Sequence, residues 1–98
     1  MGNVSIKIIY RLRDDSFETE TNAKDPVNLV GEFLRTQIDG GEDNSLANGF
    51  LIYEICLTLD TSGDIWSCQH NCGNLGLRDG ILGHYIRKMN MEKPNERD

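Results

Sequence analysis

Residues 51–70, L-I-Y-E-I-C-L-T-L-D-T-S-G-D-I-W-S-C-Q-H, decide the fold. Every second residue in the first half of this stretch is apolar, which is the period of a strand with one buried face. These residues are Leu51, Tyr53, Ile55, Leu57 and Leu59. A turn at Ser62-Gly63 would pair Trp66 with Leu59, Cys68 with Leu57 and His70 with Ile55. The stretch therefore predicts an antiparallel hairpin.

A second hairpin is predicted near the N-terminus, over residues 3 to about 21. Its first strand also alternates, with Ile9 as the one exception. The alternating apolar residues are Val4, Ile6, Ile8, Tyr10 and Leu12. A two-residue turn at Asp14 and Asp15 would set charge opposite charge and core residue opposite core residue. The resulting pairs are Arg11 with Glu18 and Leu12 with Phe17.

A helix is predicted after each hairpin. Asp25 followed by Pro26 is a typical helix start, because the carboxylate can accept from open backbone amides and proline suits the first helical position. Gly40 ends this first helix, and an exposed loop follows over residues 39–48. From about Asn74 the pattern is helical again. The apolar side of the first helix comprises Val27, Leu29, Val30, Phe33, Leu34 and Ile38, and that of the second Leu75, Ile81, Leu82, Tyr85, Ile86 and Met89.

This order of elements predicts an α+β fold with a ββαββα order, in which two helices cover one face of a four-stranded antiparallel sheet. Residues 1–90 form a single domain, and the polar residues 91–98 form a flexible tail. The two halves share the same order of elements, but no residue pattern aligns them. The sequence alone therefore gives no convincing sign of an internal repeat.

Composition narrows the classes of function. The chain has 98 residues, with 10 Lys and Arg against 16 Asp and Glu, for a net charge of -6. A field of that sign repels phosphate backbones and anionic lipids, so we expect neither nucleic acid nor membrane as a partner. Three cysteines without an export signal favour free thiols in a reducing compartment, which predicts a cytoplasmic protein.

Acidic residues cluster in two segments that the predicted topology brings to the same end of the sheet. Flexible acidic loops supply the oxygen ligands that calcium prefers, although no EF-hand motif is present. Calcium is therefore the one candidate cofactor. Its candidate ligands are Asp39, Glu42 and Asp43, with Asp14 or Asp15.

Cys68, His70 and Cys72 alternate along one strand and form a candidate metal or thiol site. In an extended strand Cys68 and Cys72 would lie about 13 Å apart, too far to share one zinc ion unless the chain bends at Gly73. We interpret Cys68 as a buried core residue and His70 as a residue at the core's edge. Cys72 precedes the second helix, where the helix dipole favours thiolate, and is predicted to be the accessible, reactive thiol.

Three glycines, Gly76, Gly80 and Gly83, follow one stripe of the second helix. Each costs about 1 kcal/mol relative to alanine in a helix, which favours a close contact there, made either by this chain's own loop or by another molecule, with His84 and Arg87 at the rim. No catalytic motif is present, and we expect no enzyme. The sequence favours a small acidic, non-catalytic binding or regulatory domain that contacts a protein partner or a second copy. The alternatives are a calcium-binding protein and a thiol-based redox or metal protein that uses Cys72 and His70.

Overall fold

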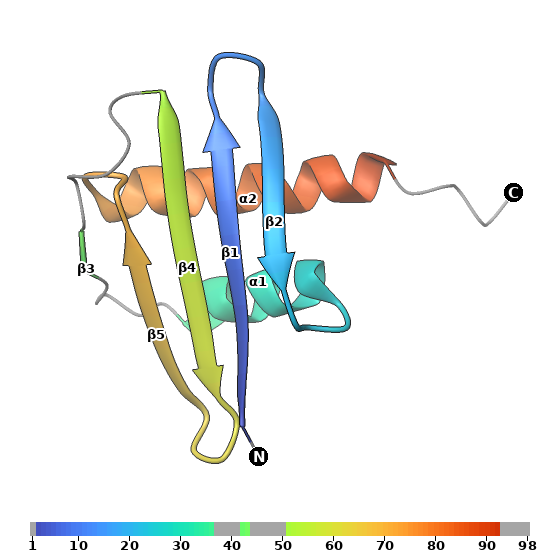
Figure 1. Ribbon diagram of the computed structural model, residues 1–98, viewed down its shortest axis with the longest axis vertical. Coiled ribbons are helices and arrows are strands. Elements are labelled where there is room, and N and C mark those ends of the chain that lie inside the picture. The colour runs from blue at the N-terminus through green and yellow to red at the C-terminus, as the bar shows by residue number, and fades with distance from the viewer. Residues whose placement is uncertain (1, 37–41, 44–50, 93–98) are drawn as a thin grey trace, which may run out of the picture.

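The structure, a computed structural model, describes residues 2–36, 42–43 and 51–92. Its elements are β1 (Asn3–Arg11), β2 (Ser16–Thr21), α1 (Pro26–Thr36), β3 (Glu42–Asp43), β4 (Ile52–Asp60), β5 (Ile65–His70) and α2 (Leu75–Glu92). The sheet order is β2-β1-β4-β5-β3, and Figure 1 shows the two helices crossing behind it. The predicted α+β fold, with four antiparallel strands in ββαββα order, is confirmed. The short β3 is an addition, parallel to the outer edge of β5.

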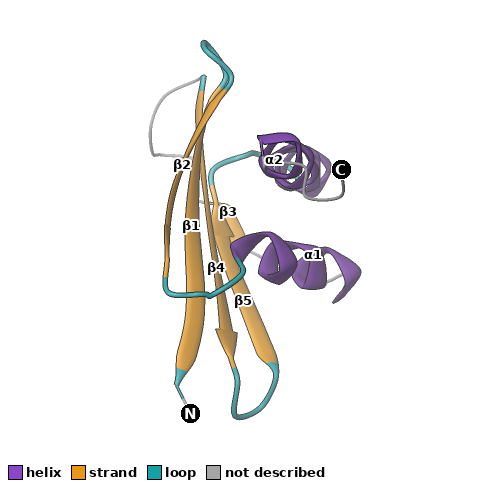
Figure 2. Ribbon diagram, turned by 90° about the vertical axis from the view of Figure 1, so that its right-hand side faces the viewer, coloured by secondary structure: helices purple, strands orange, loops and turns teal. Residues whose placement is uncertain are grey.

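Both helices lie on the same face of the sheet, as the side view in Figure 2 shows. The core fills the space between these two layers, because the apolar residues of the strands and helices point toward one another. Its fully buried side chains include Ile6, Ile8, Val30, Phe33, Ile55, Leu57 and Leu82. The opposite face of the sheet is uncovered by any described residue and carries mainly polar side chains.

The register of the second hairpin is confirmed, because Leu59 lies opposite Trp66 and Leu57 opposite Cys68. The first hairpin differs from its prediction by two positions. Tyr10, and not Leu12, lies opposite Phe17, and a four-residue turn joins the strands. Leu12 is consequently 48% exposed instead of buried. The predicted pair of Arg11 and Glu18 survives as a diagonal ion pair of 3.0 Å.

The two halves of the chain have the same backbone plan. Each element of the second half begins 49 positions after its counterpart in the first half. β1 begins at residue 3 and β4 at 52, β2 at 16 and β5 at 65, and α1 at 26 and α2 at 75. Both hairpin turns contain an aspartate with positive φ, Asp15 at 57° and Asp64 at 54°, again 49 positions apart. The chain therefore contains two copies of a ββα unit. The sequence alone had not predicted this internal structural repeat.

Hydrogen bonds repeat at the same spacing. The side chain of Asn22 accepts from Ser5 N and donates to Asn3 O, and Asn71 does the same with Glu54 N and Ile52 O. At the helix starts, Asp25 Oδ1 accepts from Asn28 N and Asn74 Oδ1 accepts from Leu77 N. The first of these bonds confirms the predicted cap at Asp25. Side chains at equivalent positions thus make the same strand and helix-cap hydrogen bonds in both units.

The two units are related by an approximate two-fold axis through the middle of the sheet. Lys7 and Cys56, which are equivalent positions of the repeat, lie opposite each other in the central β1–β4 ladder. Half a turn of Figure 1 in its own plane exchanges β1 with β4, β2 with β5 and α1 with α2. As a result, each helix lies at the end of the sheet that holds the other unit's hairpin turn.

The helix boundaries differ slightly from the predicted ones. Helix α1 extends through Thr36, and Gly40 lies outside the described residues. Helix α2 continues to Glu92, two residues into the predicted tail, and residues 93–98 lie outside the described part. Neither helix has, within the described ranges, the length and apolar character needed to cross a membrane.

Candidate functional site

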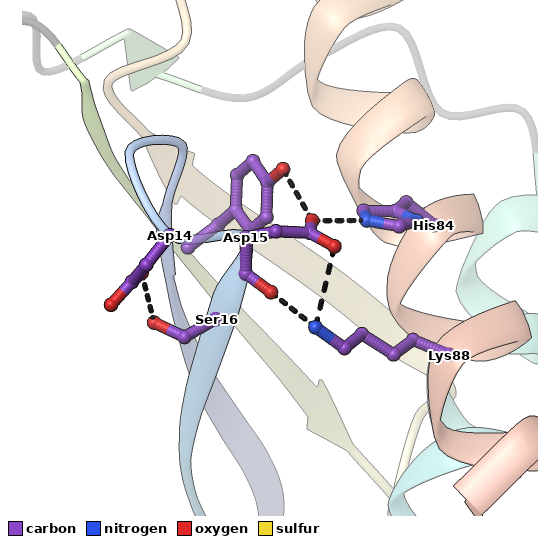
Figure 3. A network of polar contacts seen from close by, with 6 residues as sticks. Asp14, Asp15, Ser16, His84 and Lys88 are labelled. Carbon is purple, nitrogen blue, oxygen red and sulfur yellow. Dashed lines mark hydrogen bonds and ion pairs between the residues drawn. The ribbon is translucent and has the colours of Figure 1, made fainter.

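A polar cluster joins the turn of the first hairpin to the middle of α2 (Figure 3). Asp15 lies in the turn between β1 and β2, where its positive φ directs the side chain toward the helix. His84 and Lys88 lie one turn apart on the same side of α2, since residues at i and i+4 of a helix are neighbours. The approximate two-fold arrangement brings these distant segments together, because α2 covers the end of the sheet where this turn lies.

Each oxygen of the Asp15 side chain is engaged. Its Oδ1 lies 2.6 Å from His84 Nε2 and accepts a hydrogen bond of 2.7 Å from the Tyr10 hydroxyl. Its Oδ2 lies 3.4 Å from Lys88 Nζ, which also donates to the backbone oxygen of Asp15. The rings of Tyr10 and Phe17 flank the His84 ring, with centroids 5.6 and 5.4 Å away. We call Tyr10, Asp15, Phe17, His84 and Lys88 the hairpin–helix cluster.

The electrostatics of the hairpin–helix cluster fix the charge of its central carboxylate. Hydrogen bonds from His84 and then Tyr10 lower the pKa of Asp15 from 3.8 to about 2. Burial and the bond to Asp15 raise the pKa of Tyr10 to about 12. Asp15 is therefore ionised and Tyr10 protonated throughout the neutral range, so the tyrosine donates and the carboxylate accepts. This arrangement anchors the hairpin turn to α2.

The structure separates the candidate calcium ligands. Asp15 is engaged in the hairpin–helix cluster, and Asp14 accepts from the Ser16 hydroxyl at 2.8 Å. Glu42 and Asp43 form β3, at the opposite edge of the sheet from the first hairpin, and Asp39 lies outside the described residues. In the part of the chain that the structure describes, no three His, Cys, Asp or Glu side chains gather closely enough to hold a metal ion.

The predicted exposure of Cys72 is wrong. Cys72 is 5% exposed, because the chain turns inward after β5, where Asn71 bonds the backbone of β4 and Cys72 N donates to His70 Nδ1. His70 is itself only 2% exposed and belongs to the interior. Cys68 is buried, as predicted, with the Arg78 guanidinium 3.8 Å from its sulfur. Burial outweighs that cation and raises the pKa of the Cys68 thiol.

Cys56 is the most exposed of the three free thiols. It lies on the uncovered face of the sheet, in a shallow hollow of about 400 Å³ near the two-fold axis. Lys7, Glu20 and Thr58 also line this hollow. Partial burial raises the pKa of the Cys56 thiol, so this thiol is accessible without being activated as a nucleophile.

The glycine stripe of α2 has no close contact with another element among the described residues. Gly76 is the second residue of the helix, and a Cβ there would meet only the side chain of Asn74. A Cβ at Gly80 would have no heavy atom within 4 Å, and one at Gly83 would meet the flexible end of Arg87. None of the described loops therefore packs on the stripe, and most of the loop predicted at residues 39–48 lies outside the described residues.

The hairpin–helix cluster was missed at the sequence level because its members are far apart in the chain. Asp15 and His84 are 69 positions apart, and they were assigned to two different candidate sites. The i and i+4 spacing of His84 and Lys88 was the one local signal available. Arg78, 3% exposed and 4.9 Å above the Phe33 ring, was also missed, since an arginine beside a helix start normally indicates a surface position.

No protein-family model, curated protein or solved structure matches this chain.

Proposed function

We propose that this domain is a non-catalytic binding module that contacts another protein, or a second copy of itself, through the outer side of α2. The observation that carries the proposal is the composition of that side. Leu77 is 38% exposed and Met91 is 82% exposed, and both lie on the side of α2 that carries Gly76 and Gly80. Two of the four large exposed hydrophobic side chains in the described structure therefore share one helix surface.

The shape and charge of this outer side suit a protein contact. Glycine at position 80 lowers the surface between Leu77 and Met91, so another helix or loop can approach the backbone closely. Arg87 is exposed on the same side, and His84 lies at its margin. Apolar residues around a low centre, with basic residues at the rim, are typical of protein contact surfaces. The domain as a whole has a net charge of -6, so Arg87 makes this side less acidic than the rest of the surface and favours contact with it over contact elsewhere.

Photo-crosslinking from defined positions tests the proposal. A crosslinking residue at the exposed rim position 87 should capture a protein, whereas one at the exposed position 65 in β5 should not. Leu77→Glu should abolish capture from position 87. The matched control is Ile65→Glu, which replaces an equally apolar exposed side chain on another element. Equal capture from positions 87 and 65, or capture that survives Leu77→Glu, would contradict the proposal.

Sedimentation distinguishes a foreign partner from a second copy. Gly80→Ala should stabilise the isolated monomer by about 1 kcal/mol in urea unfolding, because the added methyl group meets no atom and alanine is the better helix former. If a second copy is the partner, the same substitution should weaken the dimer by overpacking the contact. A variant that is more stable, and whose association and crosslinking are unchanged, would remove α2 as the contact surface.

A further inference from the structure

The two outer edges of the antiparallel sheet are equivalent in the repeat but differ in occupancy. Along β5, the short strand β3 pairs in parallel with Gln69 and His70. The equivalent positions 49 residues earlier are Glu20 and Thr21 in β2. No described residue pairs with the outer side of β2.

The chain's own equivalent of β3 cannot fill this position. The residues 49 positions after Glu42 and Asp43 are Met91 and Glu92, and both belong to α2. Figure 1 shows α2 continuing past the β2 edge of the sheet. Within the described residues, the backbone groups on the outer side of β2 therefore have no strand beside them and are open to another molecule, which is the arrangement used for strand addition.

The charge of the edge selects the kind of strand that fits. β2 presents Glu18 and Glu20 at positions where β5 has Ser67 and Gln69. Within the domain, β1 shows what matches these glutamates, because it sets Lys7 opposite Glu20 and Arg11 within 3.0 Å of Glu18. A strand added to the outer side would meet the same two glutamates. Basic residues at alternate positions would suit them, with apolar residues between.

A second copy of this chain fits the edge poorly. Antiparallel pairing of two β2 strands must keep Phe17 and Thr19 on the helix side in both copies. Each such register that overlaps more than three of the six residues sets Glu18 opposite Glu18, or Glu18 opposite Glu20, of the other copy. Like charges directly opposite each other destabilise a strand pair. The edge therefore favours a different, basic segment.

We infer that the outer edge of β2 is a docking site for an extended segment of a partner protein in which lysine or arginine alternates with apolar residues. This surface is separate from the outer side of α2, so it goes beyond the function proposed above. The bound segment would extend the sheet next to β2 as β3 extends it next to β5. Backbone hydrogen bonds would supply affinity, and Glu18 and Glu20 would supply the preference for basic sequences.

Titration of the isotope-labelled domain with a ten-residue peptide of alternating lysine and valine tests this inference at physiological salt. Amide shifts should change along residues 16–21 and not along residues 65–70. A glutamate–valine peptide should not bind. A lysine–proline peptide has the same charge but cannot form a regular strand, and it should bind far more weakly. Equal binding of the lysine–proline peptide, or shifts outside the β2 edge, would overturn the inference.

Two double variants with the same change in net charge complete the test. Glu18→Gln with Glu20→Gln should weaken binding of the lysine–valine peptide about fivefold, the scale expected for losing two cross-strand charge pairs. Ser67→Lys with Gln69→Lys, at the equivalent positions of β5, should leave the affinity within about twofold. Equal weakening by both variants would mean that the peptide senses only net charge. Leu77→Glu should not affect peptide binding, so this inference and the proposal for α2 can fail separately.

Discussion

The two ββα units share one backbone plan and use it differently at their hairpin turns. In the first unit, the side chain of Asp15 is bound by Tyr10, His84 and Lys88, and α2 holds the turn. In the second unit, Asp64 has the same positive φ but no side-chain bond or ion pair among the described residues. That turn is closed locally instead, because Ser62 and Gly63 donate to Asp60. One turn therefore depends on tertiary structure, and the other depends on its own sequence.

The two turns show that the same positive φ at an aspartate can be maintained by different interactions. A locally closed turn is stable whenever its strands pair, and it adds little to the packing of the helix. A turn anchored through a charged side chain couples the hairpin to α2, so disturbing either should disturb the other. Equivalent positions in the two units supply matched substitutions that measure this difference.

The largest effect is expected at the equivalent aromatic residues Phe17 and Trp66. Phe17 contacts Tyr10, His84 and Tyr85, whereas Trp66 contacts Phe33. Replacing either with alanine should cost about 3 kcal/mol in urea unfolding, the low end for aromatic residues because both are half-buried. Hydrogen exchange should show that Phe17→Ala lowers the protection of the backbone amides of β2 and that Trp66→Ala lowers that of β5. Uniform loss of protection in both units would show that the units are not separable.

Asn71 and Asn22 should differ in the size of the same effect. Each makes two hydrogen bonds to the first strand of its hairpin, but Asn71 is half-buried and Asn22 is exposed. Asn71→Ala should cost about 2 kcal/mol, because it leaves two partly buried backbone groups of β4 without their bonds, and Asn22→Ala about 1 kcal/mol, because water replaces its bonds. Chemical denaturation of both variants measures the difference. Equal costs would contradict the role assigned to burial.

Acid should loosen the first turn selectively. The pKa of Asp15 is about 2 in the folded protein and near its ordinary 3.8 when unfolded, so the unfolded chain binds the proton more readily. The stabilisation by Asp15 is therefore complete above about pH 4 and is lost as the pH falls through about 2. Asp15→Asn should flatten the fall in stability over this range, measured by urea unfolding at each pH. Asp64→Asn is the control, and an equal flattening by it would contradict the assignment.

The smallest effect should differ in sign between the two turns. Asp64→Gly should raise the free energy of unfolding slightly, by about 0.5 kcal/mol. Glycine removes the backbone strain of an L-residue at positive φ, and this gain exceeds the cost of the entropy that glycine adds to the unfolded chain. Asp15→Gly gives the same backbone relief but removes the bonds to His84, Tyr10 and Lys88, and it should lower the unfolding midpoint. Thermal melts of the two variants at neutral pH make the test. Shifts of the same sign would show that the anchoring bonds do not contribute to stability.

The sequence predicted those features that depend on neighbouring residues. Alternation placed the strands, and the Asp25-Pro26 start and the helical periodicity placed the helices. The turn at Ser62-Gly63 set the register of the second hairpin, since that turn is locally closed. The predicted register of the first hairpin differs from the observed one by two positions, because the observed register depends on contacts of Tyr10 and Asp15 with His84 in α2. Local pattern contains no information on a contact 69 positions apart.

The internal repeat escaped prediction because the units share backbone geometry and few residues. Identical residues occur at four equivalent positions, Ile6 and Ile55, Asp15 and Asp64, Asn22 and Asn71, and Gly31 and Gly80. The aspartates support positive φ and the asparagines join strand ends, so these identities reflect geometry. Core positions vary freely among hydrophobic residues of similar size, which hides the relationship. The burial of Cys72 was missed for a related reason, since the inward turn depends on Asn71 bonding a strand that lies earlier in the chain.

The central pairing of β1 with β4 has a consequence for how quickly the chain folds. This ladder joins residues from 41 positions apart, Arg11 with Ile52, to 57 positions apart, Asn3 with Asp60. A lone two-stranded hairpin is marginally stable in water, so we expect neither unit to be stably folded before β1 pairs with β4. The chain must therefore close a long loop before its core contacts compensate for the lost entropy, which slows folding relative to helical proteins of equal length. Substitutions along this central ladder, more than those in either turn, should set the folding rate.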